Sequence, residues 1–453
     1  MRRTVFIVAV VLLAAAFFGG KLISQVLMPK PGEAIAADPE QVRKGDAFLD
    51  LLDTARYDDA LAMITPEVRK ALADGKLQQV WETLPKQIGE RQSRSPLRGE
   101  LVGDKALVVS TLKFPTISLD ARIGFTADGL IDSFRLVPAA SAPATVEPSS
   151  NEAFVEREFS VGTGERTLPG TLTLPKGDGA FPAVVLVHGS GPHDRDESIG
   201  PNRPFRDLAH ALAKHGIASL RYEKRTKARP EDFSGMDFTV FEETIDDAVE
   251  AIAALRGVKE IRADAVYVAG HSLGAWMAPR ILQHAQQAAG AILLAAPARP
   301  LQEIYLEQIE YLAASDGEID DADRARIDEA KAKSEEVANM GLDAKAEDNL
   351  LGLPARYWID LNAFDPIATA KSLPHPLLIL QGERDYQVTR QGDFVLWQQA
   401  FENDERAAMR LYPALNHLFI AGSGPSTGAE YFQPGKVDES VAQDIARWIG
   451  QRR

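Results

Sequence analysis

The chain has 453 residues, 45% of them hydrophobic and 25% charged, which is ordinary for a globular protein and leaves room for two or three domains. The formal net charge of −15 argues against a nucleic-acid partner, because phosphate backbones attract basic surfaces. The chain contains no cysteine, so disulfides, thiolate metal sites, cysteine nucleophiles and a lipidated N-terminal cysteine are excluded.

The N-terminal segment is predicted to direct export. Arg2 and Arg3 precede an uncharged, largely apolar run from Thr4 to Gly20, and a basic start before such a run is typical of a secretion signal. The run is long for the core of a signal peptide and short for a membrane span, so a cleaved signal stays an alternative to the signal-anchor that we favour. Either one places the rest of the protein outside the cytoplasm, secreted or periplasmic, and an uncleaved anchor would tether it to the inner membrane.

After this segment and spacer, 1–37, residues 38–137 are predicted to form a small α+β domain. Helical apolar spacing covers Pro39 to Leu52, and further helices are expected up to Ile88. Beyond Arg98 the pattern changes to strands separated by Gly-Asp and Asp-Gly turns. Helices followed by a strand meander resemble the cone-shaped domain of the nuclear-transport-factor type. We find no acid–base or metal constellation here, so binding or spacing is its expected role.

Residues 138–152 are rich in Pro, Ala and Ser without periodicity, which predicts a semi-extended linker. From 153 to 453 strands and helices alternate, beginning with an antiparallel pair and a continuous apolar strand, Ala183 to Val187. About eight strands with interleaved helices predict a doubly wound, mostly parallel sheet. The fold class is therefore α/β, preceded by the small α+β domain and the N-terminal hydrophobic segment.

A long insertion, about 298–365, interrupts this alternation after the sixth strand. It is helical by pattern and acidic, with 12 Asp or Glu against 5 Lys or Arg between Asp316 and Asp348. Its place in the chain is where a lid belongs in this architecture, and a lid would exclude water and shape an acyl pocket. A solvated helical hairpin without a gating role is the alternative.

The nucleophile is predicted from a strand, a Gly-x-Ser-x-Gly turn and a helix in direct succession. The short strand Val266 to Ala269 leads into Gly270-His271-Ser272-Leu273-Gly274, and a helix follows. This order is typical of a nucleophile elbow, in which the two glycines permit close approach and Ser272 is held in a strained conformation. An ordinary strand-to-helix turn with a surface serine is the alternative.

Two further residues complete a candidate triad, because a serine hydroxyl needs a base that is itself oriented by a carboxylate. Asp385 follows the strand Leu377 to Gln381, and His417 follows the last strand. The carboxyl ends of parallel strands meet at one edge of a sheet, so both are expected beside Ser272. Glu383 is a rival for the acid. His271 is expected to point away from Ser272. Three other histidines, His210, His215 and His284, fall on predicted helices, and His375 precedes a strand.

The oxyanion hole needs backbone N–H groups aimed at the developing charge. Leu273 supplies one, and the second is expected in His188-Gly189-Ser190-Gly191 after the third strand. We assign it to Ser190, with Gly189 as the alternative. The polar run His193 to Glu197 matches no zinc or calcium template, so we expect a salt-bridged loop rather than a metal site.

These stretches resemble the α/β-hydrolase superfamily, and in particular bacterial serine carboxylesterases that carry a small α+β domain in front. The resemblance covers about Phe154 to Arg453, and Pro39 to Val137 more loosely; it lies in HGSGPHDRDESIGPNRPFRDLA, RYEKRT, GHSLG, QGERDYQV and NHLF. It implies hydrolysis of small carboxylic esters with short acyl chains through an acyl-enzyme, without cofactor or metal. It also implies that RYEKRT braces the oxyanion loop, with Arg221 and Arg225 pairing to Asp194 or Asp196.

Two other functions stay open. A peptidase or acyltransferase of the same fold would keep the triad and change the substrate, although the β-propeller and amine-binding glutamates of such peptidases are not evident here. A non-catalytic binding protein on a hydrolase scaffold is less compatible with an intact Ser272, Asp385 and His417.

Overall fold

The computed structural model describes residues 33–452 except for gaps at 73–74, 103–104, 116–117, 140–148, 234–236, 316, 318, 320, 342–343, 345–348 and 351–352. Of the predicted signal or anchor segment and spacer, 1–37, residues 1–32 lie outside the described residues, as does most of the predicted linker. Within the described part of the chain, no helix is both long enough and apolar enough to cross a membrane.

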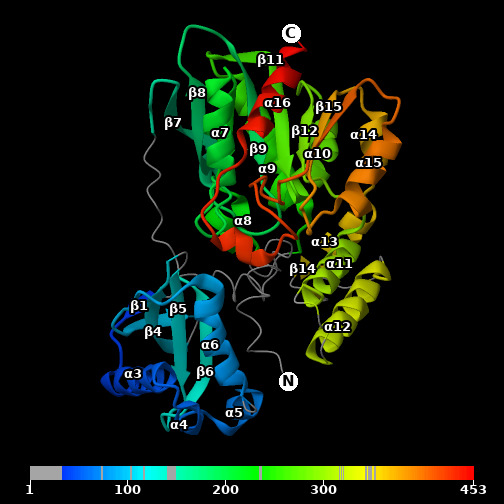
Figure 1. The fold of residues 1–453 in the computed structure, drawn as a ribbon. Helices are drawn as coiled ribbons and strands as arrows, with labels where there is room; N and C mark the ends of the chain where they lie inside the picture. Colours follow the sequence, from blue (N-terminus) through cyan, green and yellow to red (C-terminus); the bar gives the residue numbers. More distant parts are fainter. Residues whose placement is uncertain are drawn as a thin grey trace. The chain divides into compact units, whose positions relative to one another are not determined.

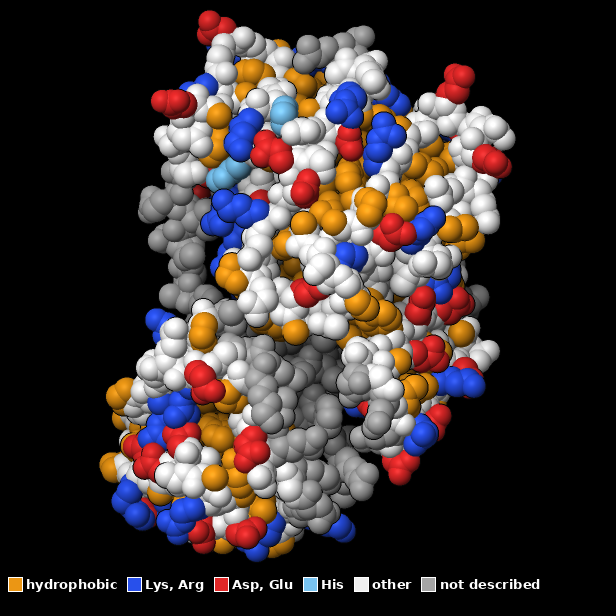
Figure 2. Space-filling view, in the orientation of Figure 1, with side chains coloured by type: hydrophobic (Ala, Val, Ile, Leu, Met, Phe, Trp, Pro, Cys, Tyr) orange, Lys and Arg blue, Asp and Glu red, His pale blue; other side chains and the backbone are white. Residues whose placement is uncertain are grey.

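The described residues form two compact units. The small unit holds 33–139 together with Gly428–Pro434, and the large unit holds 149–427 together with 435–452. Phe432, which lies in the range 153–453 of the predicted hydrolase domain, packs against the hydrophobic core of the small unit. On the face shown in Figure 2, the coloured acidic and basic side chains are interspersed rather than gathered by sign.

The small unit packs helices against one antiparallel sheet. The strand order is β1-β3-β4-β5-β6, with β2 pairing to β4. Helix α3 begins at Pro39, where the Asp38 side chain accepts hydrogen bonds from the first-turn amides, and it buries Phe48, Leu49 and Leu52. The elements are α3 (Pro39–Asp53), α4 (Tyr57–Ala62), α5 (Pro66–Leu72), α6 (Lys76–Ile88), β1 (Glu33–Ile35), β2 (Ser93–Arg94), β3 (Arg98–Val102), β4 (Lys105–Lys113), β5 (Ser118–Phe125) and β6 (Ile131–Pro138).

The large unit is built on an eight-stranded sheet of order β16-β15-β12-β11-β9-β10-β8-β7 (Figure 1). The strands pair in parallel from β16 to β10, whereas β8 and β7 are antiparallel. The predicted doubly wound, mostly parallel sheet is confirmed. Its strands are β7 (Phe154–Val161), β8 (Leu168–Pro175), β9 (Phe181–Val187), β10 (Ala218–Tyr222), β11 (Ile261–His271), β12 (Ala291–Leu294), β15 (Leu377–Gly382) and β16 (Ala407–Tyr412).

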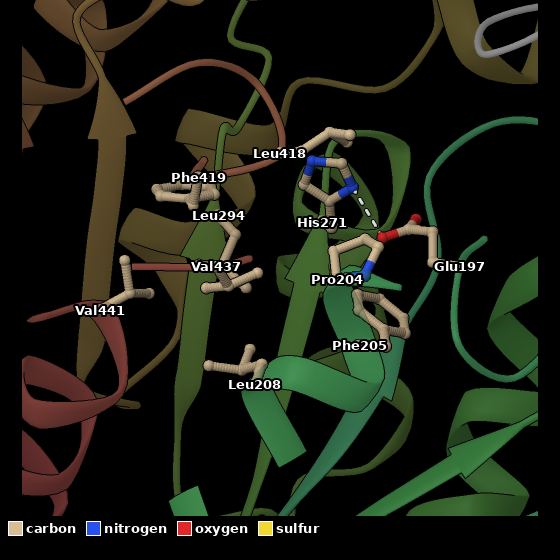
Figure 3. A pocket seen from close by; sticks show the side chains of 10 residues that line it. All are labelled: Glu197, Pro204, Phe205, Leu208, His271, Leu294, Leu418, Phe419, Val437 and Val441. Carbon is tan, nitrogen blue, oxygen red and sulfur yellow. Dashed lines mark ion pairs between the residues drawn. The ribbon is translucent and has the colours of Figure 1, made fainter. Parts of the chain in front are cut away.

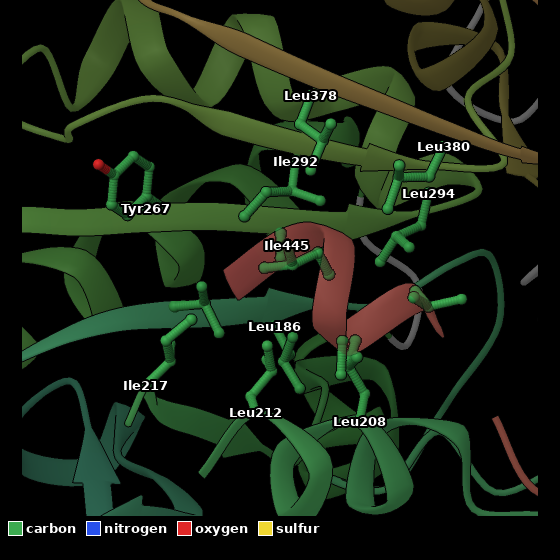
Figure 4. Close-up of a cluster of buried hydrophobic side chains, with 14 of the residues drawn as sticks. Leu186, Leu208, Leu212, Ile217, Tyr267, Ile292, Leu294, Leu378, Leu380 and Ile445 are labelled. Atoms are coloured by element: carbon green, nitrogen blue, oxygen red, sulfur yellow. The ribbon is translucent and has the colours of Figure 1, made fainter. Parts of the chain in front are cut away.

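Helices cover both faces of this sheet, which explains why its central strands are continuously apolar. Figure 4 shows side chains of β9, β11, β12 and β15 meeting those of α7 (Pro204–Lys214) and α16 (Glu439–Gly450) on one face. Helices α9 (Asp246–Arg256) and α10 (Leu273–His284) pack on the other face, and α14 (Pro366–Ser372) packs on α10. The rigid sheet thus holds the loops at its carboxyl edge.

Two helices of the large unit each follow a π-helical turn. The turn Phe241–Ile245 precedes α9, and the turn Arg390–Phe394 precedes α15 (Val395–Ala400). Such turns often occur at functional sites, because they redirect one side chain of a helix. The first of them carries the buried Glu243.

The insertion contains α11 (Leu301–Ala313), α12 (Asp321–Ala338), the short strands β13 (Asn349–Leu350) and β14 (Leu353–Pro354), and α13 (Ala355–Asn362). Helix α11 is attached to the loop after β15: Gln308 Nε2 donates to the Gln387 carbonyl at 2.9 Å. The rings of Tyr311 and Tyr386 stack at 5.1 Å. If the insertion moves as a lid, either these contacts break or α11 stays in place while the rest of the insertion moves.

Candidate active site

Ser272 stands between β11 and α10 with φ 54° and ψ −117°, one of the few non-glycine residues of the described chain with positive φ. Such a conformation is strained for a residue with a Cβ atom, and strain of this kind concentrates at functional sites. The Ser272 amide donates to the Leu294 carbonyl at 2.9 Å, which ties the turn to β12. The side chain is buried, and its Oγ makes no hydrogen bond among the described residues.

The two glycines of the turn are required by close backbone approach. A Cβ atom on Gly270 would lie 2.2 Å from the Gly274 carbonyl carbon, and one on Gly274 would lie 2.2 Å from the Val187 carbonyl oxygen. Both distances are far inside van der Waals contact, so no larger residue fits. The turn therefore presses directly against the end of β9, where the oxyanion loop begins.

The structure brings Asp385 and His417 together. Asp385 Oδ2 lies 2.8 Å from His417 Nδ1, and both side chains are buried. Asp385 Oδ1 accepts hydrogen bonds from the amides of Gln387 and Val388 at 2.8 and 3.0 Å, so the carboxylate is held in one orientation. Glu383, the rival acid, instead pairs with Arg390 at the surface, at 2.6 Å.

His417 is also held against the nucleophile turn. The ring of His271, the residue before Ser272, lies 4.6 Å from the His417 ring, and its Nε2 lies 2.9 Å from the His417 carbonyl oxygen. The Asn416 side chain accepts from the amides of Leu418 and Ile420 at 3.0 and 3.1 Å, which fixes the turn that carries the histidine. Catalytic hydrogen bonds to a nucleophile often tighten only when substrate is bound.

The predicted oxyanion loop lies beside the predicted nucleophile: a Cβ atom on Gly189 would be 3.2 Å from Ser272 Cβ. The Gly189 amide donates to Glu197 Oε1 at 2.6 Å, so it is engaged and cannot also serve an oxyanion. The Ser190 amide has no acceptor among the described residues. Of our two alternatives for the second donor, this geometry favours Ser190. The first-turn amide of Leu273 lacks an intrahelical acceptor by its position.

A buried ion pair, which we did not foresee, joins the oxyanion loop to the nucleophile turn. Glu197 Oε2 lies 3.0 Å from His271 Nδ1, within a largely apolar surround (Figure 3). A cavity of about 20 Å³ beside it is far too small for an ester; its lining includes Phe205, Leu208 and Phe419. Glu197 thus holds Gly189 with one oxygen and His271 with the other.

The charges of this pair support each other. Burial disfavours the Glu197 carboxylate, but His271, with His193 and His188, outweighs it and lowers the carboxyl pKa to about 2. Burial likewise disfavours a charged His271, but Glu197 outweighs it and raises the imidazole pKa above its ordinary 6.5. The pair is therefore ionised in the folded protein over the middle of the pH range.

Replacing Glu197 by glutamine is expected to destabilise the fold by about 3 kcal/mol near pH 5.5, because His271 loses its buried counter-ion. The carboxylate contributes stability above its ordinary pKa of 4.5 and loses it as the pH falls towards 2. The imidazole contributes stability below 6.5 and loses it as the pH rises through its raised pKa. Urea unfolding across the pH range should therefore show the largest difference between 4.5 and 6.5.

The control is Glu158→Gln, because Glu158 is a largely exposed glutamate that pairs with Arg195 at 3.2 Å. Its effect should be much smaller and nearly independent of pH, since exposed ion pairs contribute little. A Glu197→Gln penalty that stayed constant from pH 4 to pH 9 would contradict the ion pair.

The RYEKRT segment braces the site in a way that corrects one expectation. Arg221 pairs with Asp196 and with the buried Glu156, as a member of the expected arginine–aspartate brace. Arg225 does not reach the oxyanion loop: its Nε lies 3.0 Å from Asp247 Oδ2, on α9. The reason is that Arg225 begins the short helix α8 (Arg225–Ala228), which turns its side chain towards α9.

The polar run after the oxyanion loop is salt-bridged. Arg195 pairs with Glu223 at 2.9 Å, and Asp194 Oδ1 accepts from the amides of Asp196 and Ser198 at 3.1 and 2.9 Å. Within the described ranges, no group of three or more His, Asp or Glu residues is arranged to hold a metal ion.

Comparison with known proteins gives matches for both units. A family model described as "Alpha/beta hydrolase family" matches residues 184–426, and one described as a protein of unknown function matches 46–134. The curated protein "Esterase EstD" of Thermotoga maritima is 36% identical over 406 residues, which cover 89% of this chain and 93% of the relative.

Solved structures similar to the chain include Est1E from Butyrivibrio proteoclasticus, with 16% identity, a TM-score of 0.41 and coverage of 65% of this chain and 98% of that one. An esterase of Pyrococcus furiosus has 15% identity and a TM-score of 0.38, with coverage of 66% and 91%.

Proposed function

Because the chain belongs to the alpha/beta hydrolase family, we propose that it is a serine carboxylesterase whose triad is Ser272, His417 and Asp385. The observation that carries the proposal is the buried 2.8 Å contact of Asp385 with His417, in a loop that touches the strained turn of Ser272. The relationship to Esterase EstD supports an ester as the substrate.

In the first half of the proposed reaction, His417 Nε2 takes the hydroxyl proton of Ser272 as Oγ attacks the ester carbonyl carbon. The carbonyl π electrons move onto oxygen, and the amides of Leu273 and Ser190 stabilise the resulting oxyanion. When the tetrahedral intermediate collapses, the bond to the alkoxy group breaks, and His417 gives its proton to the leaving alcohol. An acyl-enzyme remains.

Water completes the cycle. His417 takes one of its protons while the oxygen attacks the acyl carbon, and the proton then returns to Ser272 as the acid leaves. Asp385 keeps the imidazole in the tautomer with the proton on Nδ1 and stabilises the imidazolium that forms twice per turnover. The held orientation of the Asp385 carboxylate, with two amides on Oδ1, supports this role.

We propose short acyl chains as the preferred substrates. Trp276, one turn after Ser272 on α10, is buried, and its ring lies 6.2 Å from that of Phe364. We take this buried aromatic bulk, one turn from the proposed nucleophile, as support for a short acyl pocket.

A substrate panel tests the proposal: p-nitrophenyl acetate, butyrate, octanoate and laurate against a peptide p-nitroanilide, with fluorophosphonate labelling of the same sample. We expect labelling and turnover that is highest for acetate or butyrate. Faster cleavage of the amide would make the enzyme a peptidase. A soluble, folded sample with neither label nor turnover would favour the binding protein.

A further inference from the structure

A buried lysine lies beside the oxyanion loop and is used by none of the steps above. Lys224, between β10 and α8, has a side chain that is only 3% exposed. Its Nζ donates to the Gly189 carbonyl oxygen at 2.8 Å and lies 2.7 Å from Glu243 Oε1. A fully buried lysine is rare and costly unless its charge is paired and its protons are bound.

We propose that Lys224 is a positioning residue for the oxyanion hole: by holding the Gly189 carbonyl, it aims the Ser190 amide at the substrate. The Gly189 carbonyl and the Ser190 N–H belong to one peptide plane. In a trans peptide the carbonyl and the following N–H point in opposite directions, so fixing one fixes the other. The Ser190 N–H therefore points away from Lys224. This inference rests on the proposed function.

The charge of Lys224 adds to its geometric role. A cation bound to the Gly189 carbonyl oxygen draws electron density from the peptide group and makes the Ser190 N–H a stronger donor. Linked hydrogen bonds polarise one another in this way in the low-dielectric interior of a protein. Such a donor is already in place when the oxyanion forms, which is what lowers the barrier. A neutral donor on the same oxygen would orient the peptide but polarise it less.

Lys224 is itself held from two other elements of the large unit. Glu243, in the π-helical turn before α9, binds its Nζ, and the hydroxyl of Tyr357, on α13, donates to Glu243. All three side chains are buried. The chain of contacts runs from α13 of the insertion through Glu243 and Lys224 to the Gly189–Ser190 peptide.

Gly189 is thus clamped on both sides. Its amide is bound by Glu197 Oε1 at 2.6 Å and its carbonyl by Lys224 at 2.8 Å. The peptide before Gly189 and the peptide after it are each oriented by one buried charge. The loop can present the Ser190 amide without reorganising when substrate binds, which is the condition for effective stabilisation of an oxyanion.

The test compares Lys224→Met with the wild-type enzyme on p-nitrophenyl acetate and on its thiono analogue, in which sulfur replaces the carbonyl oxygen. We expect kcat for the oxygen ester to fall by about 10- to 100-fold with KM changed by less than about 3-fold, because only the transition state uses the donor. Sulfur is a weak acceptor, so the thiono ester should lose much less. The ratio of the two rates should therefore fall.

Lys224→Met leaves Glu243 without its cation and can unfold the protein, so the double variant Lys224→Met/Glu243→Gln is made as well. Glutamine keeps an acceptor for Tyr357 and removes the orphan charge. We expect this variant to regain stability towards urea, while its kcat and its oxygen-to-sulfur ratio stay low. Recovery of kcat together with stability would make Lys224 structural only and would overturn the inference.

Lys227→Met is the matched control, because Lys227 is an exposed lysine three residues further along the same segment. It should behave as wild type. If the wild-type enzyme turns over esters and Lys224→Met keeps both its kcat and its oxygen-to-sulfur rate ratio, the positioning role of Lys224 is wrong while the proposed function stands. If the wild-type enzyme neither turns over esters nor reacts with a fluorophosphonate, the proposed function fails first.

Discussion

Ser272→Ala is expected to lower kcat for p-nitrophenyl acetate by about 10⁴- to 10⁶-fold, the loss typical when the nucleophile of a triad is removed. The fold should be unaffected. Ser272 Oγ makes no hydrogen bond among the described residues, so its removal leaves no buried polar group unpaired. Alanine can occupy the same backbone conformation at no greater strain than serine. Steady-state kinetics and urea unfolding of the same preparations measure both effects.

Ser372→Ala serves as the control, since Ser372 is an exposed serine at the end of α14. It should change neither turnover nor stability. Retention of more than about one tenth of the wild-type kcat in Ser272→Ala would mean that another group is the nucleophile. Loss of both activity and folding would instead point to a structural role for the hydroxyl.

Asp385→Asn is expected to lower kcat by about 10⁴-fold with little change in KM, because it reverses the tautomer of His417. The amide oxygen takes over the hydrogen bonds from Gln387 and Val388, which leaves the NH₂ group facing His417 Nδ1. Nδ1 must then accept a hydrogen bond, so the proton moves to Nε2, the nitrogen that should take the proton of Ser272. The positions of the three side chains should therefore be preserved, while His417 can no longer accept the proton of Ser272.

Glu383→Gln is the matched control two residues earlier in the same loop. Glu383 pairs with Arg390 at the surface, and side-chain exposures of 36% and 42% mean that this pair contributes little. We expect near wild-type kinetics from this variant. A large loss of kcat in Glu383→Gln together with a small loss in Asp385→Asn would mean that Glu383, and not Asp385, is the acid of the triad.

Much of the site follows from the order of strands along the chain. Ser272 comes directly after β11, and Asp385 and His417 lie in the loops that follow β15 and β16; parallel strands place their carboxyl ends at one edge. The Gly-x-Ser-x-Gly turn similarly predicted the close approach that the two glycines permit. These inferences need only local patterns and one rule of topology, so they could be made before any contact was known.

Contacts between residues distant in sequence could not be obtained in this way. RYEKRT contains Arg221, Lys224 and Arg225 within five positions, and nothing in its letters says which cation reaches the oxyanion loop. Helix α8 directs Arg225 to Asp247, while Lys224 binds the Gly189 carbonyl. The partner of a buried charge is chosen by where strands and helices pack, and a segment alone does not carry that information.

The sequence by itself determined the class of sheet and which loops meet at its edge, because hydrophobic periodicity and chain order are local properties. Only the tertiary structure distinguishes the amides of Gly189 and Ser190, because it shows the Gly189 amide bound to Glu197, which favours Ser190 as the proposed donor. Glu197 and Lys224 come from different segments of the chain. Only the assembled sheet brings the first to the Gly189 amide and the second to the Gly189 carbonyl. Hydrogen bonds are short and directional, so the choice of donor depends on positions that folding sets within a few tenths of an ångström.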